Sequence, residues 1–113
     1  MQILTDPISI DKLTIIAQAM FGNLVKAVVD IEQGVIALDA PMHSDLEALL
    51  LSNGSKQSDL WGINLHPDQV NTQYFIEFDS VINLRPHEDN RSRGVESIAI
   101  RNRITKVVKS YIK

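Results

Sequence analysis

The spacing of apolar residues near the N-terminus predicts an amphipathic helix. Ser9 precedes it as an N-cap, Asp11 suits the positive end of the helix dipole, and Gly22 offers the left-handed conformation that ends many helices. The segment Met1 to Ile8 allows a short edge strand through Ile3. The apolar stripe recurs at helical spacing in Leu13, Ile16, Ala17 and Met20.

A β-hairpin is predicted over residues Leu24 to Ala40. Residues 24–31 and 35–40 are rich in valine, isoleucine and other apolar residues, and Glu32-Gln33-Gly34 supplies a short loop that ends in glycine. Neither segment alternates strictly between apolar and polar positions. We therefore expect both faces of the hairpin to be covered, at the centre of a sheet with helices on at least one side. Pro41 ends the second strand.

A second helix is predicted after the hairpin. Ser44-Asp45-Leu46-Glu47 fits a capping box, in which Ser44 accepts a hydrogen bond from the N–H of Glu47 and the Glu47 side chain accepts one from the N–H of Ser44. Asn53-Gly54 marks its end. Its apolar stripe is formed by Leu46, Leu49 and Leu50.

Two further strands follow, separated by a polar loop from Pro67 to Gln73. The first covers Leu60 to Leu65, and the second covers Phe75 to Arg85 and ends at Pro86. In the second strand one face is mostly polar, through Glu77, Asp79, Asn83 and Arg85, and we expect Asn64 of the neighbouring strand to join it. The opposite face is mostly apolar, through Ile76, Phe78, Ile82 and Leu84.

The last predicted helix begins near Ser97. Its apolar stripe is Ile100, Ile104, Val107, Val108 and Tyr111. Its opposite face carries Arg103, Lys106, Lys109, Ser110 and Lys113. The whole pattern predicts a single α+β domain over residues 1–113, in the order α-β-β-α-β-β-α. We expect a mostly antiparallel four-stranded sheet packed with helices.

Composition narrows the class of protein. The 113 residues are 44% hydrophobic and 22% charged, which is typical of a folded globular chain. There is no cysteine, so disulfides, thiolate nucleophiles and cysteine-ligated metals are excluded. No stretch approaches the roughly 18 apolar residues of a membrane span, and no secretory signal is recognisable. We therefore expect a cytoplasmic protein.

Charge is distributed unevenly along the chain. Residues 1–81 hold 11 acidic and 3 basic residues, whereas residues 82–113 hold 3 acidic and 8 basic residues. This asymmetry suits an anionic partner, and it equally suits attraction between the two parts of the chain.

The polar face of the strand from Phe75 to Arg85 is the first candidate site. Glu77 and Asp79 lie about 6–7 Å apart along a strand, which allows one to act as acid and the other as base. His43 is a further catalytic candidate, and His43 or His66 nearby would allow a divalent cation to bind. No metal site is predicted, because no recognised ligand spacing occurs. The alternative is a face that only meets solvent.

An arginine-rich loop is the second candidate site. Arg85, Asn90, Arg91, Ser92 and Arg93 supply many hydrogen-bond donors just before a helix N-terminus, a setting that favours phosphate or carboxylate. The alternative is that these arginines pair with acidic residues of the same chain. The basic face of the last helix is the third candidate: it either follows a nucleic-acid backbone or is simply the solvated side of the helix.

Several segments resemble a family of small bacterial proteins that is known only as a domain of unknown function. The resemblance covers nearly the whole chain and implies no activity, cofactor or catalytic residue. The segments that carry it are Gly54-Ser55-Lys56-Gln57, Asp59-Leu60-Trp61-Gly62-Ile63-Asn64, Phe75-Ile76-Glu77-Phe78-Asp79-Ser80, Ile82-Asn83-Leu84-Arg85-Pro86 and Asn90-Arg91-Ser92-Arg93.

Two classes of function follow from the candidate sites. The first is a non-enzymatic binding or regulatory module, forming a homo-oligomer, that recognises an anionic ligand or nucleic acid through the loop Arg85 to Arg93. The second is a small hydrolase or nucleic-acid-processing enzyme that uses Glu77 and Asp79 with the arginines. A component of a toxin–antitoxin pair is a further alternative. No cofactor is predicted.

Overall fold

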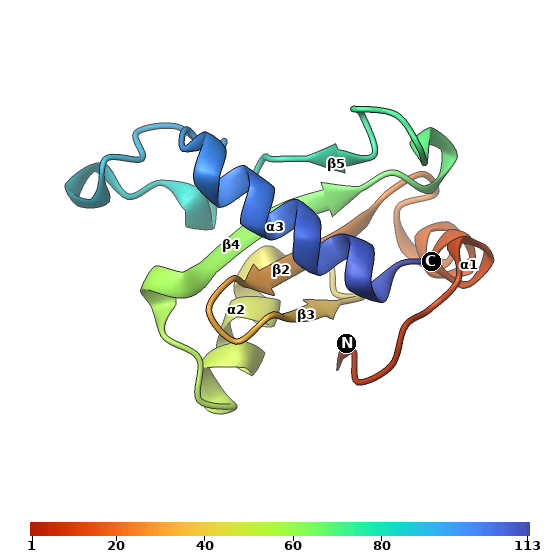
Figure 1. Cartoon of the computed structure of the whole chain (residues 1–113). Helices are drawn as coiled ribbons and strands as arrows, with labels where there is room; N and C mark the ends of the chain where they lie inside the picture. Colours follow the sequence, from red (N-terminus) through yellow and green to blue (C-terminus); the bar gives the residue numbers. More distant parts are fainter.

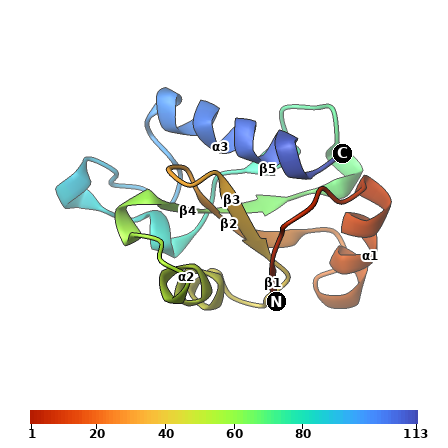
Figure 2. The same cartoon turned by 60° about the horizontal axis from the view of Figure 1, so that its bottom comes forward.

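A five-stranded antiparallel sheet with helices on both faces forms the α+β fold (Figures 1 and 2). The computed structural model describes residues 1–113. The strands lie in the order β1-β3-β2-β4-β5. The α-helices are α1 (Ile10–Met20), α2 (His43–Ser52) and α3 (Ile98–Tyr111). The strands are β1 (Gln2–Ile3), β2 (Val25–Asp30), β3 (Val35–Leu38), β4 (Leu60–Leu65) and β5 (Ile76–Glu77).

The single α+β domain with three helices and an antiparallel sheet is confirmed, and the predicted number and order of the elements are corrected. Residues Gln2 and Ile3 pair with Leu38 and Ala37, which adds β1 as a fifth, edge strand to the predicted four. The hairpin is present as β2 and β3, and both of its strands are largely buried, as expected for the centre of a sheet. No helix of the structure has the length and apolar character that spanning a bilayer requires.

Two of the predicted helix starts are confirmed by their capping hydrogen bonds. The Ser9 hydroxyl accepts a hydrogen bond of 3.0 Å from the N–H of Lys12 at the start of α1. The Ser97 hydroxyl accepts one of 3.2 Å from the N–H of Ile100 at the start of α3. Each bond satisfies one of the N–H groups that a first helical turn leaves without a partner.

The predicted capping box of α2 is wrong. The helix begins at His43, its N-cap is Met42, and no side chain caps it. The physical reason is a tertiary contact: His43 Nε2 lies 2.7 Å from the carbonyl oxygen of Ile63 on β4. This bond fixes the first residue of α2 against the sheet, so Ser44 falls inside the first turn instead of before it.

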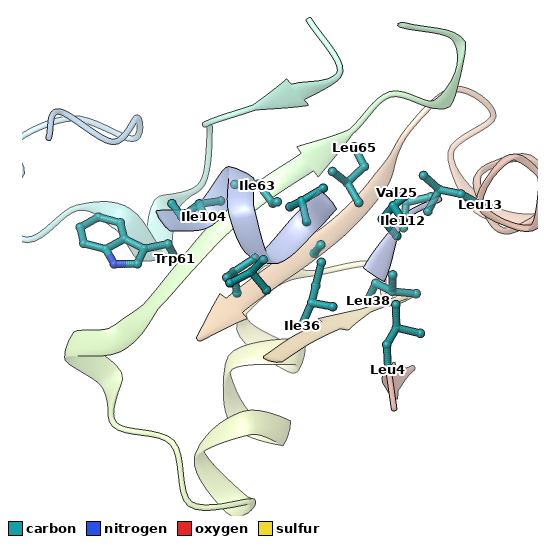
Figure 3. Close-up of a cluster of buried hydrophobic side chains, with 14 of the residues drawn as sticks. Leu4, Leu13, Val25, Ile36, Leu38, Trp61, Ile63, Leu65, Ile104 and Ile112 are labelled. Atoms are coloured by element: carbon teal, nitrogen blue, oxygen red, sulfur yellow. The ribbon is translucent and has the colours of Figure 1, made fainter. Parts of the chain in front are cut away.

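Two hydrophobic clusters lie on the two faces of the sheet. Helix α3 covers one face and α1 packs against the end of the same cluster, where side chains such as Leu13, Ile63 and Ile104 are fully buried (Figure 3). Helix α2 covers part of the other face, through Leu46 and Leu50. Burying a leucine or isoleucine side chain stabilises a fold by about 1.5–3 kcal/mol. The sheet is therefore anchored on both sides.

The strand predicted from Phe75 to Arg85 is mostly wrong. Only Ile76 and Glu77 pair with β4, and the chain then continues as an irregular segment with a short 3-10 helix at Val81–Asn83. The segment crosses β4 at Gly62, where a Cβ atom would lie 2.5 Å from the Cβ of Ser80. Beyond Glu77 the predicted alternation of faces therefore does not apply.

The side chain of Asn83 takes the place of a paired strand at this crossing. Its Oδ1 accepts a 2.8 Å hydrogen bond from the N–H of Gly62, and its Nδ2 donates to the Gly62 carbonyl oxygen at 2.9 Å. Nδ2 also donates to the carbonyl oxygen of Arg93 at 3.0 Å. One buried amide thus completes the edge of β4 and holds the segment in place.

Candidate functional site

A row of polar residues crosses the sheet on the side that α2 only partly covers. Lys26 on β2 is the register partner of Asn64 on β4, and Asn64 is the partner of Glu77 on β5. Register partners share a face of the sheet. We call this row and its polar neighbours the polar face, which consists of Lys26, His43, Asn64, His66, Glu77, Asp79 and Arg93.

Glu77 is held by two side chains of the polar face. Its Oε1 accepts a 3.0 Å hydrogen bond from Asn64 Nδ2 and lies 3.1 Å from His66 Nε2. The Glu77 side chain is 48% exposed, whereas that of His66 is 20% exposed. The carboxylate is therefore oriented by the protein while remaining open to solvent, which is the state a ligand-binding carboxylate requires.

Asn64 carries an acceptor that the chain leaves unused. Only 7% of the residue is exposed, and its Nδ2 donates both to Glu77 and to the carbonyl oxygen of Asp79, the latter at 3.4 Å. Its Oδ1 is buried and has no hydrogen-bond partner. A buried acceptor without a partner costs about 1–3 kcal/mol, and such atoms are few in native proteins.

His43 contributes a neutral imidazole to the polar face. Because a carbonyl oxygen only accepts hydrogen bonds, the Nε2 that contacts Ile63 carries the proton, and Nδ1 carries the lone pair. Burial lowers the pKa of His43, against the opposing effect of the hydrogen bond to Ile63; the positive charge of Lys26 lowers it further. His43 is therefore uncharged at neutral pH.

Asp79 and Arg93 form an ion pair at the border of the polar face. Arg93 Nε donates to Asp79 Oδ1 at 2.8 Å, with both side chains about half exposed. The Asp79 carboxylate is therefore paired with Arg93, whereas the Glu77 carboxylate is bound by Asn64 and His66. No group of three or more histidine and acidic side chains lies close enough together to hold a metal ion.

A groove with a volume of about 440 Å³ adjoins Glu77 and His66. Such volumes suit a small molecule. Of the predicted catalytic residues only Glu77 lines the groove, whereas His43 and Asp79 do not. The lining is mostly polar and consists of His66, Gln69, Gln73, Tyr74, Ile76 and Glu77.

Arg85, predicted to bind an anion, lies inside the structure. It is 3% exposed, and its guanidinium stacks 4.2 Å from the centre of the Trp61 ring. Burial lowers the pKa of Arg85, against the opposing charge of Glu88. Its guanidinium donates to three main-chain carbonyl oxygens, those of Ser58, Leu60 and Ile82. Because it is buried, the guanidinium is not open to a ligand.

The remaining donors of the arginine loop are largely satisfied by the loop itself. Asn90 is buried, and its amide nitrogen donates to the carbonyl oxygens of Asn83 and Gly94 at 2.7 and 2.8 Å. The main-chain N–H groups of Arg91 and Ser92 both donate to the Glu96 carboxylate. The Arg91 side chain is 69% exposed and its guanidinium lies 4.0 Å from the Asp89 carboxylate, whereas the Arg93 side chain is 56% exposed and binds Asp79.

Sequence reasoning placed Glu77, Asn64 and His66 near one another but missed the structural role of Asn83 and the buried position of Arg85. A glycine inside a strand often marks close approach of another backbone. Gly62, at the centre of β4, was therefore the available signal for the crossing segment. Nothing in the sequence pattern signals that Arg85 stacks on Trp61.

Comparison with known proteins agrees with the resemblance found in the sequence. Neither the curated proteins nor the solved structures contain a match to the chain. A family model described as "Protein of unknown function (DUF5674)" matches residues 2–111. That span includes every strand and helix of the fold and the whole polar face. The chain belongs to the DUF5674 family of proteins of unknown function.

Proposed function

We propose that the protein is a small-molecule binding module whose ligand presents an ammonium group, or a comparable hydrogen-bond donor, to Glu77. The observation that carries the proposal is the Glu77 carboxylate, held by Asn64 and His66 at the edge of a 440 Å³ groove. A carboxylate fixed in this way loses little conformational entropy when a ligand binds.

Several acceptors of the polar face receive no hydrogen bond from the chain. Only Oε1 of Glu77 takes hydrogen bonds from the chain, and Oδ1 of Asn64 is buried without a partner. Nδ1 of His43 carries a lone pair as well, because Nε2 is the donor to Ile63. Of these acceptors only the Glu77 carboxylate lines the groove, and an acceptor there favours a ligand that brings a donor. The net charge of −8 over residues 1–81 adds a general attraction for cations.

A matched set of ligands tests this preference. Butylamine, butanol and butyrate share one alkyl chain and differ in the charge and donor capacity of the end group. In a titration followed by amide NMR shifts, we expect butylamine to shift His66, Tyr74 and Glu77 saturably and butyrate to leave them unchanged. Glu77→Gln removes the charge and should weaken butylamine binding roughly tenfold, which corresponds to ~1.4 kcal/mol.

Asp6→Asn is the matched control for Glu77→Gln. Asp6 is an exposed carboxylate outside the polar face, so its replacement removes the same net charge without touching the groove. Butylamine affinity should be unchanged in this variant. Equal binding of butyrate and butylamine, or equal losses in the two variants, would contradict the proposal.

Proton transfer by His66 and Glu77 is a second candidate function. The 3.1 Å contact between His66 Nε2 and Glu77 Oε1 orients the imidazole as carboxylates do in many general acid–base sites. Glu77 suits this role better than Asp79, whose carboxylate is bound by Arg93. Hydrolysis of p-nitrophenyl acetate and p-nitrophenyl phosphate, lost in His66→Gln but retained in Asp6→Asn, would support it. Equal rates in the two variants would exclude it for these substrates.

The remaining predicted partners and roles stay predictions. An anionic ligand or nucleic acid at the arginine loop is supported by the exposed side chains of Arg91 and Arg93, whereas Arg85 and Asn90 are buried. Assembly into a homo-oligomer, location in the cytoplasm and membership of a toxin–antitoxin pair rest on the sequence arguments above.

A further inference from the structure

A second groove is lined by residues of α3 and of the segment 70–78. Its volume is about 520 Å³, within the range of small-molecule sites. Half of its lining residues are apolar and include Phe75, Phe78 and Ile112, which we call the apolar floor. Phe75 and Phe78 pack against the main hydrophobic cluster, and Ile112 belongs to it. The groove therefore has a rigid apolar floor.

The α3 side of this groove is basic. Arg101, Thr105 and Lys109 are spaced four residues apart, so they lie on one stripe of the helix. The Arg101 guanidinium is 5.3 Å from the centre of the Phe78 ring, which places a positive charge near one end of the groove. Thr105 and Lys109 line the groove directly.

Lys109 has no acidic partner in the chain. None of the ion pairs of the structure includes it, although Arg103 on another side of α3 is paired with Glu32. Lys109 is exposed, and its charge lies at the rim of an apolar floor. A site of this kind is complementary to a molecule that combines an apolar body with one negative charge.

We propose that this groove binds a small organic acid, with its carbon chain or ring on Phe75 and Phe78 and its carboxylate at Lys109. Moving an apolar body from water onto the apolar floor is favourable, and a bare phosphate or a nucleic-acid backbone has no such apolar body. The carboxylate then forms an ion pair with the ammonium group of Lys109. This site is separate from Glu77 and selects the opposite sign of charge.

Octanoate and octanol test the site. In an amide NMR titration below the micellar range, we expect octanoate to shift Phe75, Phe78, Thr105 and Lys109 saturably. Octanol should bind more weakly by about fivefold, since an exposed charge pair contributes up to ~1 kcal/mol. Lys109→Gln should weaken octanoate binding by the same factor and leave octanol binding unchanged.

Lys106→Gln is the control, because Lys106 lines a different depression on α3 beside Gln33 and Gly34. It removes the same charge from the same helix and should leave octanoate affinity unchanged. Thr105→Phe fills the groove and should abolish binding of both octanoate and octanol.

Four outcomes would overturn the proposal: no saturable shift, equal affinity for octanoate and octanol, equal loss in the two lysine variants, or binding only to anionic lipid vesicles. Thr105 and Lys109 report on this groove and His66 and Glu77 on the other. The result is therefore independent of the function proposed for Glu77.

Discussion

Replacing Asn83 by alanine removes the amide that closes the edge of β4. Asn83 is fully buried, and its side chain makes three hydrogen bonds, two to the main chain of Gly62 and one to the carbonyl oxygen of Arg93. Each is worth about 1 kcal/mol net, and the N–H and C=O groups left buried without partners cost more. We therefore expect Asn83→Ala to lower the free energy of unfolding by about 3–5 kcal/mol.

Urea denaturation followed by circular dichroism measures this loss. Asn23→Ala is the matched control: Asn23 is exposed and its side chain makes no hydrogen bond, so the change should stay within about 0.5 kcal/mol. The midpoint for Asn83→Ala should fall without a large change in the slope, since the surface exposed on unfolding is nearly the same. A loss below about 1 kcal/mol would refute the argument that this amide replaces a strand.

Three further substitutions test contacts around β4. Gly62→Ala places a Cβ atom 2.5 Å from that of Ser80 and should cost about 1–3 kcal/mol in urea denaturation; a neutral effect would contradict the close crossing. Because the pKa of His43 is lowered in the folded protein, the unfolded chain binds a proton at this residue more readily, so the free energy of unfolding should fall as pH drops below about 6.5. The fall should be less steep in His43→Gln. Parallel pH profiles of the two proteins would contradict the lowered pKa. Arg85→Lys should cost about 2–4 kcal/mol because buried carbonyl oxygens lose donors, whereas Arg93→Gln should cost less than about 1 kcal/mol; similar losses in thermal melts would argue against a buried role for Arg85.

Elements whose signals are local could be predicted from the sequence. Ser9 and Ser97 each cap the helix that follows, because the capping bond joins residues three positions apart. The loop ending in Gly34 likewise joins β2 and β3, since a glycine there adopts the positive φ of 68° that the turn requires. Strands β2 and β4 could likewise be predicted, because their apolar residues are visible in the sequence without knowledge of distant contacts.

Elements decided by distant contacts could not be predicted. The bond from His43 to Ile63 moves the start of α2, and it joins residues 20 positions apart. The segment after Glu77 leaves the sheet because Asn83 binds Gly62, 21 positions earlier. A pattern of period two describes a strand only as long as it pairs, so it placed Glu77 correctly on the polar side and misplaced Arg85.

The same distinction explains the candidate site. Glu77, Asn64 and His66 lie on neighbouring paired strands or directly beside them, so alternation was enough to bring them to one face. The arginine loop was predicted to bind an anion because it is rich in hydrogen-bond donors. That composition does not show which donors bind carbonyl oxygens of the chain itself. Asn90 and Arg85 are turned inward by those carbonyls.

The titration of wild type and Glu77→Gln with butylamine tests the central claim most directly. We expect saturable amide shifts at His66, Tyr74 and Glu77 in the wild type, a roughly tenfold weaker affinity in Glu77→Gln, and no change in Asp6→Asn. Butyrate should produce no such shifts. Butylamine binding that is the same in wild type and Glu77→Gln, or that shifts residues away from the groove, would contradict a ligand site at Glu77.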